Sequence, residues 1–128
     1  MDMKILIIED DKWFAESLAL IIKSILEQCS QRIVHTAETA MTVIDEWQPD
    51  LLLLDLMLGT KNGLVLLHEL QSYIDTRRIP IIIISIDGKR LNLDDLKQLG
   101  VVDVIDKTEM TPESLYTAIN KAKETNLG

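Results

Sequence analysis

Five short, strongly apolar runs are the feature that most constrains the fold of this 128-residue chain. Three of them, KILII, LLLL and IPIIII, are apolar almost without interruption. A strand with one face in water alternates apolar and polar residues, whereas a strand covered on both faces does not. None of the runs is long enough to cross a membrane as a helix. The chain is therefore expected to build a sheet that is buried on both sides.

Amphipathic segments of helical period separate these runs. In the first segment, apolar residues recur at Phe14, Leu18, Ile22 and Ile25, the spacing of a helix with one buried face. The last segment begins with Thr111 as its N-cap and Pro112 at its first helical position. The predicted strands span residues 4–8, 32–36, 51–54, 79–84 and 101–105, and the other helices span about 37–47, 64–73, 89–99 and 112–123.

Five alternating strand and helix units predict an α/β fold, with a parallel sheet between two layers of helices. The second and fifth runs, RIVHT and VVDVI, carry polar residues and are therefore expected at the edges of the sheet. With right-handed crossovers, the pattern predicts a flavodoxin-like (βα)5 doubly wound sheet of strand order 2-1-3-4-5. Its ligand crevice lies between the carboxyl ends of strands one and three. Because no linker or repeat interrupts the pattern, we expect a single domain over residues 1–128.

Charge and cysteine content exclude several classes of function. Thirteen Lys and Arg against 21 Asp and Glu give a net charge of −8, which disfavours direct binding to nucleic acid or to an anionic membrane. The single Cys29 cannot form an internal disulfide, and we interpret it as a packing residue near the end of the first helix. The start MDMKILIIED lacks the features of a signal peptide, so a cytoplasmic location is expected.

Polar side chains follow four of the predicted strands at their carboxyl ends. They are Glu9, Asp10 and Asp11 after the first strand, Asp55 after the third, Ser85 after the fourth and Lys107 after the fifth. Because the carboxyl ends of parallel strands meet at one edge of a sheet, these side chains are expected to lie together. Neighbouring carboxylates repel unless a cation compensates. Mg²⁺, which takes oxygen ligands from carboxylates and a phosphate, suits such a site.

A carboxylate beside Mg²⁺ can attack a phosphoryl group and become an acyl phosphate. Asp55, which closes a run of four leucines, is the best-placed nucleophile, and Ser85 and Lys107 are suited to neutralise phosphoryl oxygens. Each residue also has an ordinary structural interpretation. Asp10 and Asp11 are good helix caps, and serine and lysine are usually solvated surface residues. Only their common register with Asp55 favours a shared site.

These motifs and their spacing resemble the receiver domain of bacterial two-component response regulators over essentially the whole chain. The acidic pair falls on Glu9 and Asp10 in ILIIED, the phosphoacceptor on Asp55 in PDLLLLDLML, the hydroxyl residue on Ser85 in PIIIIS, the lysine on Lys107 in VDVIDK and the loop glycine on Gly63. The resemblance implies that Glu9, Asp10, Asp55 and the backbone carbonyl of Met57 bind Mg²⁺. It also implies that a histidine kinase or phosphotransfer protein donates a phosphoryl group to Asp55, with Ser85 and Lys107 binding that group.

The same resemblance implies a switch rather than an enzyme that turns over a substrate. Such a domain catalyses only its own phosphorylation and dephosphorylation. Phosphorylation is expected to shift a two-state equilibrium at the face formed by the fourth helix, the fifth strand and the fifth helix. A homodimer, and an output domain absent from this chain, are further partners that the resemblance implies.

Several positions depart from the family pattern. Ile86 stands where Ala or Gly is usual, so it is expected to restrict the approach of the phosphoryl donor. Met57 and Asp87 are expected to border the path of a hydrolytic water and to influence phosphoryl lifetime. Val104 stands where the family usually has its switch aromatic, and Asp106 places an acid beside Lys107. These departures leave open a pseudo-receiver, or protein-interaction module, that signals without phosphorylation.

Two other classes of protein share parts of this pattern. A magnesium-dependent phosphatase of the haloacid dehalogenase type also uses a strand-end Asp nucleophile, but it needs a second acid where Met57 stands. A flavodoxin-like cofactor binder needs a phosphate-binding turn after the first strand, and the turn here, EDDKW, is acidic and has no glycine. His35 and His68 have no matching partner in the sequence and are expected at the surface.

Overall fold

The computed structural model describes residues 2–58, 61–86 and 88–127. Its strands are β1 (Met3–Ile8), β2 (Cys29–Val34), β3 (Leu51–Leu54), β4 (Met57–Leu58), β5 (Lys61–Asn62), β6 (Ile81–Ser85) and β7 (Val101–Asp106). Its helices are α1 (Lys12–Ile25), α2 (Ala37–Trp47), α3 (Gly63–Ser72), α4 (Leu93–Lys97) and α5 (Pro112–Leu127), with a 3₁₀ turn at Gly88–Arg90 before α4. Among the described residues, no helix combines the length and the apolar character that a membrane span requires.

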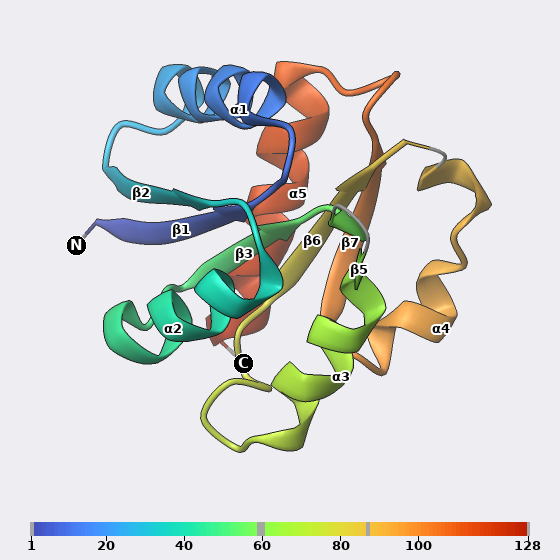
Figure 1. Cartoon of the computed structure of the whole chain (residues 1–128). Coiled ribbons are helices and arrows are strands. Elements are labelled where there is room, and N and C mark those ends of the chain that lie inside the picture. The colour runs from blue at the N-terminus through green and yellow to red at the C-terminus, as the bar shows by residue number, and fades with distance from the viewer. Residues whose placement is uncertain (1, 59–60, 87, 128) are drawn as a thin grey trace.

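One parallel sheet of five strands forms the centre of the molecule, in the order β2-β1-β3-β6-β7. This order confirms the predicted α/β class and the 2-1-3-4-5 arrangement of the five main strands, with the two polar runs at the edges. Helices α1 and α5 cover one face of the sheet, and α2, α3 and α4 cover the other (Figure 1). β4 and β5 form a separate antiparallel pair of two residues each, between β3 and α3.

The core consists of two aliphatic layers, one on each face of the sheet. Along β3, Leu51 and Leu53 pack with α1 and α5, whereas Leu52 and Leu54 pack with α2, α3 and α4. All four side chains are buried. Burial of one leucine side chain contributes about 2 kcal/mol, so the uninterrupted run is explained by a strand that needs apolar residues on both sides.

The predicted start of α5 is confirmed by reciprocal capping. The Ser114 N–H donates to Thr111 Oγ1 at 3.0 Å, and the Thr111 N–H donates to Ser114 Oγ at 2.9 Å. Pro112 occupies the first helical position, where its missing N–H costs no intrahelical bond. These bonds fix the end of the β7–α5 loop, which begins at Lys107.

The prediction of one helix over residues 89–99 is wrong. The segment is a 3₁₀ turn followed by the five-residue α4, because the Asn92 side chain accepts from the N–H groups of Asp94 and Asp95 and starts a new helix. Gly88 lies against the backbone of Asp106, and a Cβ at Gly88 would be 3.0 Å from Asp106 Cα. The turn is therefore held against β7 instead of continuing into α4.

The placement of the second strand and of Cys29 also needs correction. β2 spans Cys29–Val34 rather than residues 32–36, since Met3 pairs with Cys29 at the start of the β1–β2 register. Cys29 is therefore the first residue of β2 and not part of the first helix, which ends at Ile25. It is half-buried against the α1 and α5 layer, as expected of a packing residue.

Candidate functional site

The functional candidates meet at the carboxyl edge of the sheet. Backbone hydrogen bonds continue between neighbouring strands beyond their ends: the Asp55 N–H donates to Ile8 O at 3.1 Å, and the Lys107 N–H donates to Ser85 O at 3.0 Å. These bonds place β1, β3, β6 and β7 in a register that ends at one rim. The structure thereby brings Asp55, Ser85 and Lys107 together, with Glu9 beside them.

The Asp55 carboxylate is buried and oriented by three donors. Its Oδ1 accepts from Ser85 Oγ at 3.0 Å and from the Met57 N–H at 3.0 Å, and its Oδ2 accepts from Lys107 Nζ at 2.8 Å. Only 5% of Asp55 is exposed. A buried carboxylate is costly unless its oxygens are paired, so these three bonds explain how the fold tolerates Asp55 after four leucines.

Lys107 is the positive centre of the site. Its ammonium lies 2.5 Å from Glu9 Oε1 and 2.8 Å from Asp55 Oδ2, and 4.4 Å from the centre of the Phe14 ring. Burial lowers the pKa of Lys107, but the hydrogen bonds to Asp55 and Glu9 and the charges of both carboxylates outweigh burial and raise that pKa above its ordinary value. Lys107 therefore stays charged and compensates the two buried acids.

Glu9 is an acid with a perturbed pKa. Burial raises its pKa to about 7, even though its hydrogen bonds from Lys107 and from the Asp11 N–H act in the opposite direction; the charge of Asp55 raises the pKa further. The Glu9 side chain is 3% exposed, and its Oε2 accepts from the Asp11 N–H at 3.1 Å. A bound cation would favour the ionised form of Glu9.

Three carboxylates can hold a cation at this edge. One oxygen from each of Glu9, Asp10 and Asp55 lies within 4.8 Å of the others. Asp10 is exposed, so the group is open to solvent on one side. Oxygen donors alone are the set that Mg²⁺ prefers, with water or phosphate oxygen completing its shell, and the donor set therefore fits Mg²⁺.

The structure separates the two neighbouring aspartates. Asp11 is the N-cap of α1, and its Oδ1 accepts from the Phe14 N–H at 3.1 Å. The capping interpretation therefore applies to Asp11, whereas Asp10 lies with the carboxylate group of Glu9 and Asp55.

Gly63 supports the loop that carries Asp55. It begins α3, and its N–H donates to Leu56 O at 2.7 Å. A Cβ at this position would lie 2.8 Å from Leu56 Cα and 3.0 Å from Asp55 O. Since both are backbone atoms, only glycine fits here without moving the segment that follows Asp55.

Three large apolar side chains that are close in sequence to site residues are exposed. Met57 is 65% exposed, Ile86 is 62% exposed and Trp13, at the start of α1, is 81% exposed. Asp87, the other residue expected to influence phosphoryl lifetime, lies outside the described residues. Val104 is half-buried and packs against the layer of α2, α3 and α4.

The Asp106 side chain accepts hydrogen bonds from the loop that follows it. Its Oδ1 accepts from the Thr108 N–H at 2.9 Å and from Thr108 Oγ1 at 2.5 Å, and these hydrogen bonds lower the pKa of Asp106. Nearby, Lys89 pairs with Glu109 at 2.6 Å, which ties the 3₁₀ turn to the β7–α5 loop. Asp106 therefore orders the loop after Lys107.

Two residues near the site were not predicted from the sequence to contact site residues. Phe14 supplies the ring against Lys107, and His35, expected at the surface, is half-buried with Nδ1 2.8 Å from the Glu9 carbonyl oxygen. Only His68 is exposed as expected. Only their positions in the sequence indicated that they lie near the site: His35 directly follows β2, and Phe14 lies in the first turn of α1.

Known proteins share this architecture. A family model described as the response regulator receiver domain matches residues 5–120. The chain is 33% identical over 106 residues to the transcriptional regulatory protein CpxR of Klebsiella pneumoniae, and 31% identical over 85 residues to the DNA-binding response regulator MtrA of Mycolicibacterium smegmatis. These matches cover 81% and 66% of this chain but only 42% and 35% of the relatives, so the chain spans less than half of their length.

Solved structures agree with these matches. A sensor protein from Polaromonas sp. JS666 has a TM-score of 0.88 at 23% identity, covering 97% of this chain and 98% of the other, which shows the fold. The signal receiver domain of a DNA-binding response regulator (merR) from Colwellia psychrerythraea 34H has a TM-score of 0.81 at 27% identity, covering 96% and 99% of the two chains.

Proposed function

The chain belongs to the response regulator receiver domain family, and on that premise we propose that it is a phosphorylation switch. Asp55 accepts a phosphoryl group from a histidine kinase or phosphotransfer protein. One observation carries the proposal: a buried carboxylate held by Ser85 Oγ and Lys107 Nζ, with two further acids beside it. Neither structural packing nor helix capping requires this combination at the ends of four different strands.

The proposed transfer uses one oxygen of Asp55 as the nucleophile. It attacks the phosphorus atom, a P–O bond forms, and the P–N bond of a phosphohistidine breaks, with its electron pair passing to the imidazole nitrogen. The Ser85 hydroxyl and the Lys107 ammonium, which now donate to Asp55, then donate to phosphoryl oxygens of the acyl phosphate. Ser85 and Lys107 thus donate first to the Asp55 carboxylate and, after transfer, to the phosphoryl oxygens.

Mg²⁺ is the proposed cofactor, held by carboxylates of Glu9, Asp10 and Asp55 and by the backbone carbonyl of Met57. When bound, it supplies positive charge against a phosphoryl oxygen. The proximity of the three carboxylates supports this assignment. Glu9 must be ionised to serve as a ligand, and its raised pKa makes metal binding stronger above neutral pH than below it.

The residues around the site are proposed to set access and lifetime. Ile86 and Met57, both largely exposed, restrict the approach of the phosphoryl donor and of a hydrolytic water. We assign the same influence to Asp87. The domain catalyses only its own phosphorylation and dephosphorylation in this proposal, and residues 1–128 act as one unit in the cytoplasm.

Output is proposed to leave through α4, β7 and α5. The relatives are named for transcriptional regulation and DNA binding, so we propose a homodimer or an attached output domain as the recipient of the signal. This domain itself, with a net charge of −8, is not proposed to bind nucleic acid.

Intact mass after incubation with Mg²⁺ and acetyl phosphate tests the proposal. We expect wild type to gain one phosphoryl group, Asp55→Asn to gain none, and a metal chelator to prevent the gain. Asp45→Asn, an exposed aspartate on α2, is the matched control and should be phosphorylated like wild type.

Ile86→Ala distinguishes a blocked site from an inactive one. A gain in Ile86→Ala alone would show that the isoleucine excludes the small donor. If neither wild type nor Ile86→Ala gains a phosphoryl group, the phosphorylation proposal is wrong and the pseudo-receiver interpretation takes its place.

A further inference from the structure

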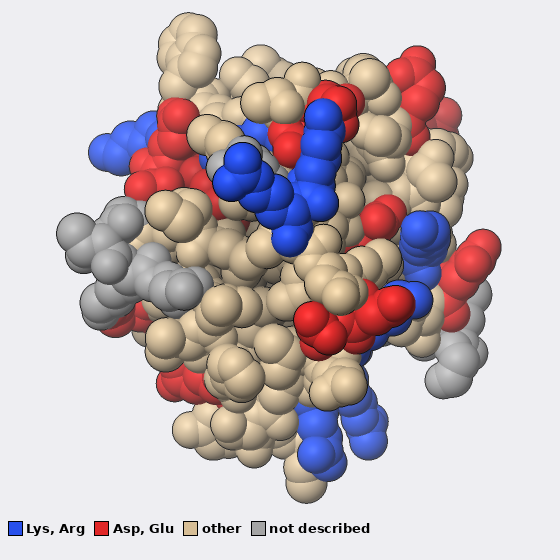
Figure 2. All heavy atoms as spheres, turned by 90° about the vertical axis from the view of Figure 1, so that its right-hand side faces the viewer, with Lys and Arg blue, Asp and Glu red and all other residues tan. Residues whose placement is uncertain are grey.

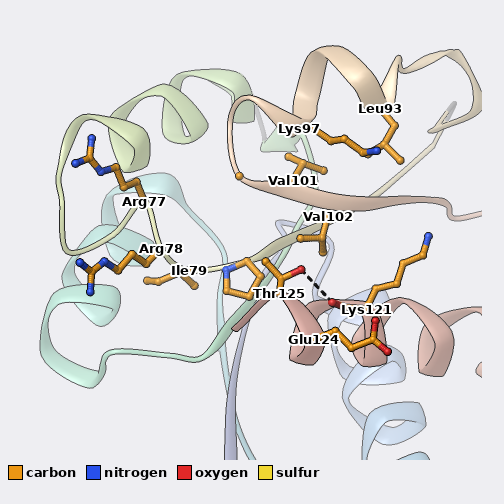
Figure 3. A pocket seen from close by; sticks show the side chains of 12 residues that line it. Arg77, Arg78, Ile79, Leu93, Lys97, Val101, Val102, Lys121, Glu124 and Thr125 are labelled. Carbon is orange, nitrogen blue, oxygen red and sulfur yellow. Dashed lines mark hydrogen bonds between the residues drawn. The ribbon is translucent and has the colours of Figure 1, made fainter. Parts of the chain in front are cut away.

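A second charged region lies at the opposite end of the sheet from Asp55. A groove of about 600 Å³ runs between the loop that joins α3 to β6, the helix α4, the start of β7 and the last turns of α5. Charged residues from three of these elements line it: Arg77 and Arg78 from the loop, Lys97 from α4, and Lys121 and Glu124 from α5. Figure 3 shows the arginines together at one end of the groove and Lys121 at the other.

The two arginines differ from the lysines in their partners. Lys121 pairs with Asp103 at 3.4 Å, and Lys97 faces Asp94 at 3.9 Å. Within residues 2–58, 61–86 and 88–127, neither Arg77 nor Arg78 forms an ion pair, and both are exposed. In Figure 3 both guanidinium groups point away from Val101 and Val102.

The floor of the groove is apolar. Ile79, Val101 and Val102 line it between the basic residues, and Val101 is buried. Figure 2 shows blue side chains at the lower end of the molecule, where Figure 1 places the α3–β6 loop, with mostly tan surface around them. Four basic residues and one acid, Glu124, line the groove around this apolar floor, which suits a ligand that is both acidic and apolar.

The groove adjoins a second one. Arg78 and Ile79 also line a groove of about 330 Å³ on the other side of the loop, together with Ile44 and Asp45 of α2. The same loop exposes Ile74, which is 62% exposed and lines this second groove. A ligand that uses both grooves must be extended and must pass over Arg78 and Ile79, which line both.

We propose that the α3–β6 loop is the docking site of an extended segment of a partner protein. Acidic residues of that segment pair with Arg77 and Arg78, and an apolar residue packs on Ile79 and Val102. Arginine binds carboxylates through two parallel hydrogen bonds, which favours such pairing over long-range attraction alone. The proposal is independent of phosphorylation at Asp55.

Nucleic acid fits this surface less well. A duplex carries regularly spaced phosphates, and beyond Arg78 these would meet Asp45 and Asp75, which line the second groove. A peptide needs acidic residues only where the arginines lie. The net charge of −8 also opposes a polyanion more strongly than a short segment with few charges.

Selection of short random peptides displayed on phage, against the whole chain, tests this inference. We expect the recovered peptides to be enriched in Asp and Glu beside an apolar residue. A synthetic copy of the most enriched peptide should bind wild type and bind Arg77→Glu/Arg78→Glu at least about tenfold more weakly, by fluorescence anisotropy. The control Lys23→Glu/Arg90→Glu changes the net charge equally at exposed positions and should bind like wild type.

Three results would overturn the inference. They are the recovery of no peptide or of peptides without acidic residues, equal weakening in both double variants, and tighter binding of a short DNA duplex at the same arginines. Urea unfolding of the arginine variant, which is expected to match wild type, shows that the variant is folded, and this control does not depend on phosphorylation of Asp55.

Discussion

The two ends of the sheet differ in whether their charged side chains are buried and paired. At the carboxyl end, Glu9 and Asp55 are buried and share one ammonium, that of Lys107. At the other end, Arg77 and Arg78 are exposed and form no ion pair among the described residues. The buried charges of one end are paired within the protein, whereas the two arginines of the other end are exposed to solvent.

The difference shows which charges the fold itself depends on. Buried charges are costly unless they are paired, so the carboxyl end contributes to stability only while every partner is present. Exposed charges cost little and contribute little. A substitution of a charged residue should therefore destabilise the domain at the carboxyl end and leave it folded at the other end. The arginines of the α3–β6 loop are then available to bind a partner without loss of stability.

Lys107→Met should have the largest effect on stability. It leaves Glu9 and Asp55 buried without a cation, and we expect the free energy of unfolding at pH 8 to fall by about 3 to 5 kcal/mol. Urea unfolding followed by tryptophan fluorescence measures this change. Lys121→Met, which removes an exposed partner of Asp103, is the matched control and should cost less than about 1 kcal/mol. Similar losses in the two variants would contradict the expected difference.

The pH dependence of stability should follow Glu9. Its pKa is about 7 in the folded protein against an ordinary value of 4.5, so the folded state binds more protons than the unfolded state between these values. This contribution is present at low pH and is lost as pH rises through about 7. We expect the metal-free domain to lose up to roughly 3 kcal/mol of stability across this window.

Glu9→Gln tests that assignment, because it keeps the shape of the side chain and removes its titration. The slope between pH 5 and pH 8 should flatten relative to wild type, and Mg²⁺ should stabilise wild type more at pH 8 than at pH 6. An unchanged slope in the variant would assign the pH dependence to another group.

Replacing one glycine at each end of the sheet with alanine compares how much the backbone there depends on glycine. Gly63→Ala should cost about 2 to 3 kcal/mol, since the new Cβ would meet the backbone at Leu56 Cα. Gly100→Ala should cost about 1 to 2 kcal/mol, because Gly100 has a φ of +85° but the nearest atom is the flexible Gln71 Nε2. Chemical denaturation of both variants measures the order, and a larger loss at Gly100 would contradict it.

Much of the fold followed from the apolar runs. Residues 51–54 and 37–47 have the predicted bounds, because burial on both faces and a single amphipathic stripe leave clear patterns. β2 was misplaced because its polar first half, from Cys29, pairs with β1 through a register that only the folded sheet determines. The segment before α4 was predicted as helix, and the packing of Gly88 on the backbone of Asp106 prevents this.

The candidate site was predictable where it depends on strand ends. Asp55, Ser85 and Lys107 directly follow or close strands of a parallel sheet, so their convergence follows from topology. Contacts from other elements were not predictable. The Phe14 ring reaches Lys107 from α1, and His35 reaches the backbone of Glu9 from the end of β2, and both depend on how these elements pack.

Arg77→Glu/Arg78→Glu should have the smallest effect on stability. Neither arginine has an ion pair to lose among the described residues, and exposed substitutions usually change stability by less than about 0.5 kcal/mol. Since the variant makes the chain still more negative, any loss should be largest at low ionic strength and should disappear at about 0.15 M salt. Urea unfolding at both salt concentrations measures it. A loss near that of Lys107→Met would mean that the loop is part of the stabilising structure, and the unpaired arginines would then need a partner within the fold rather than outside it.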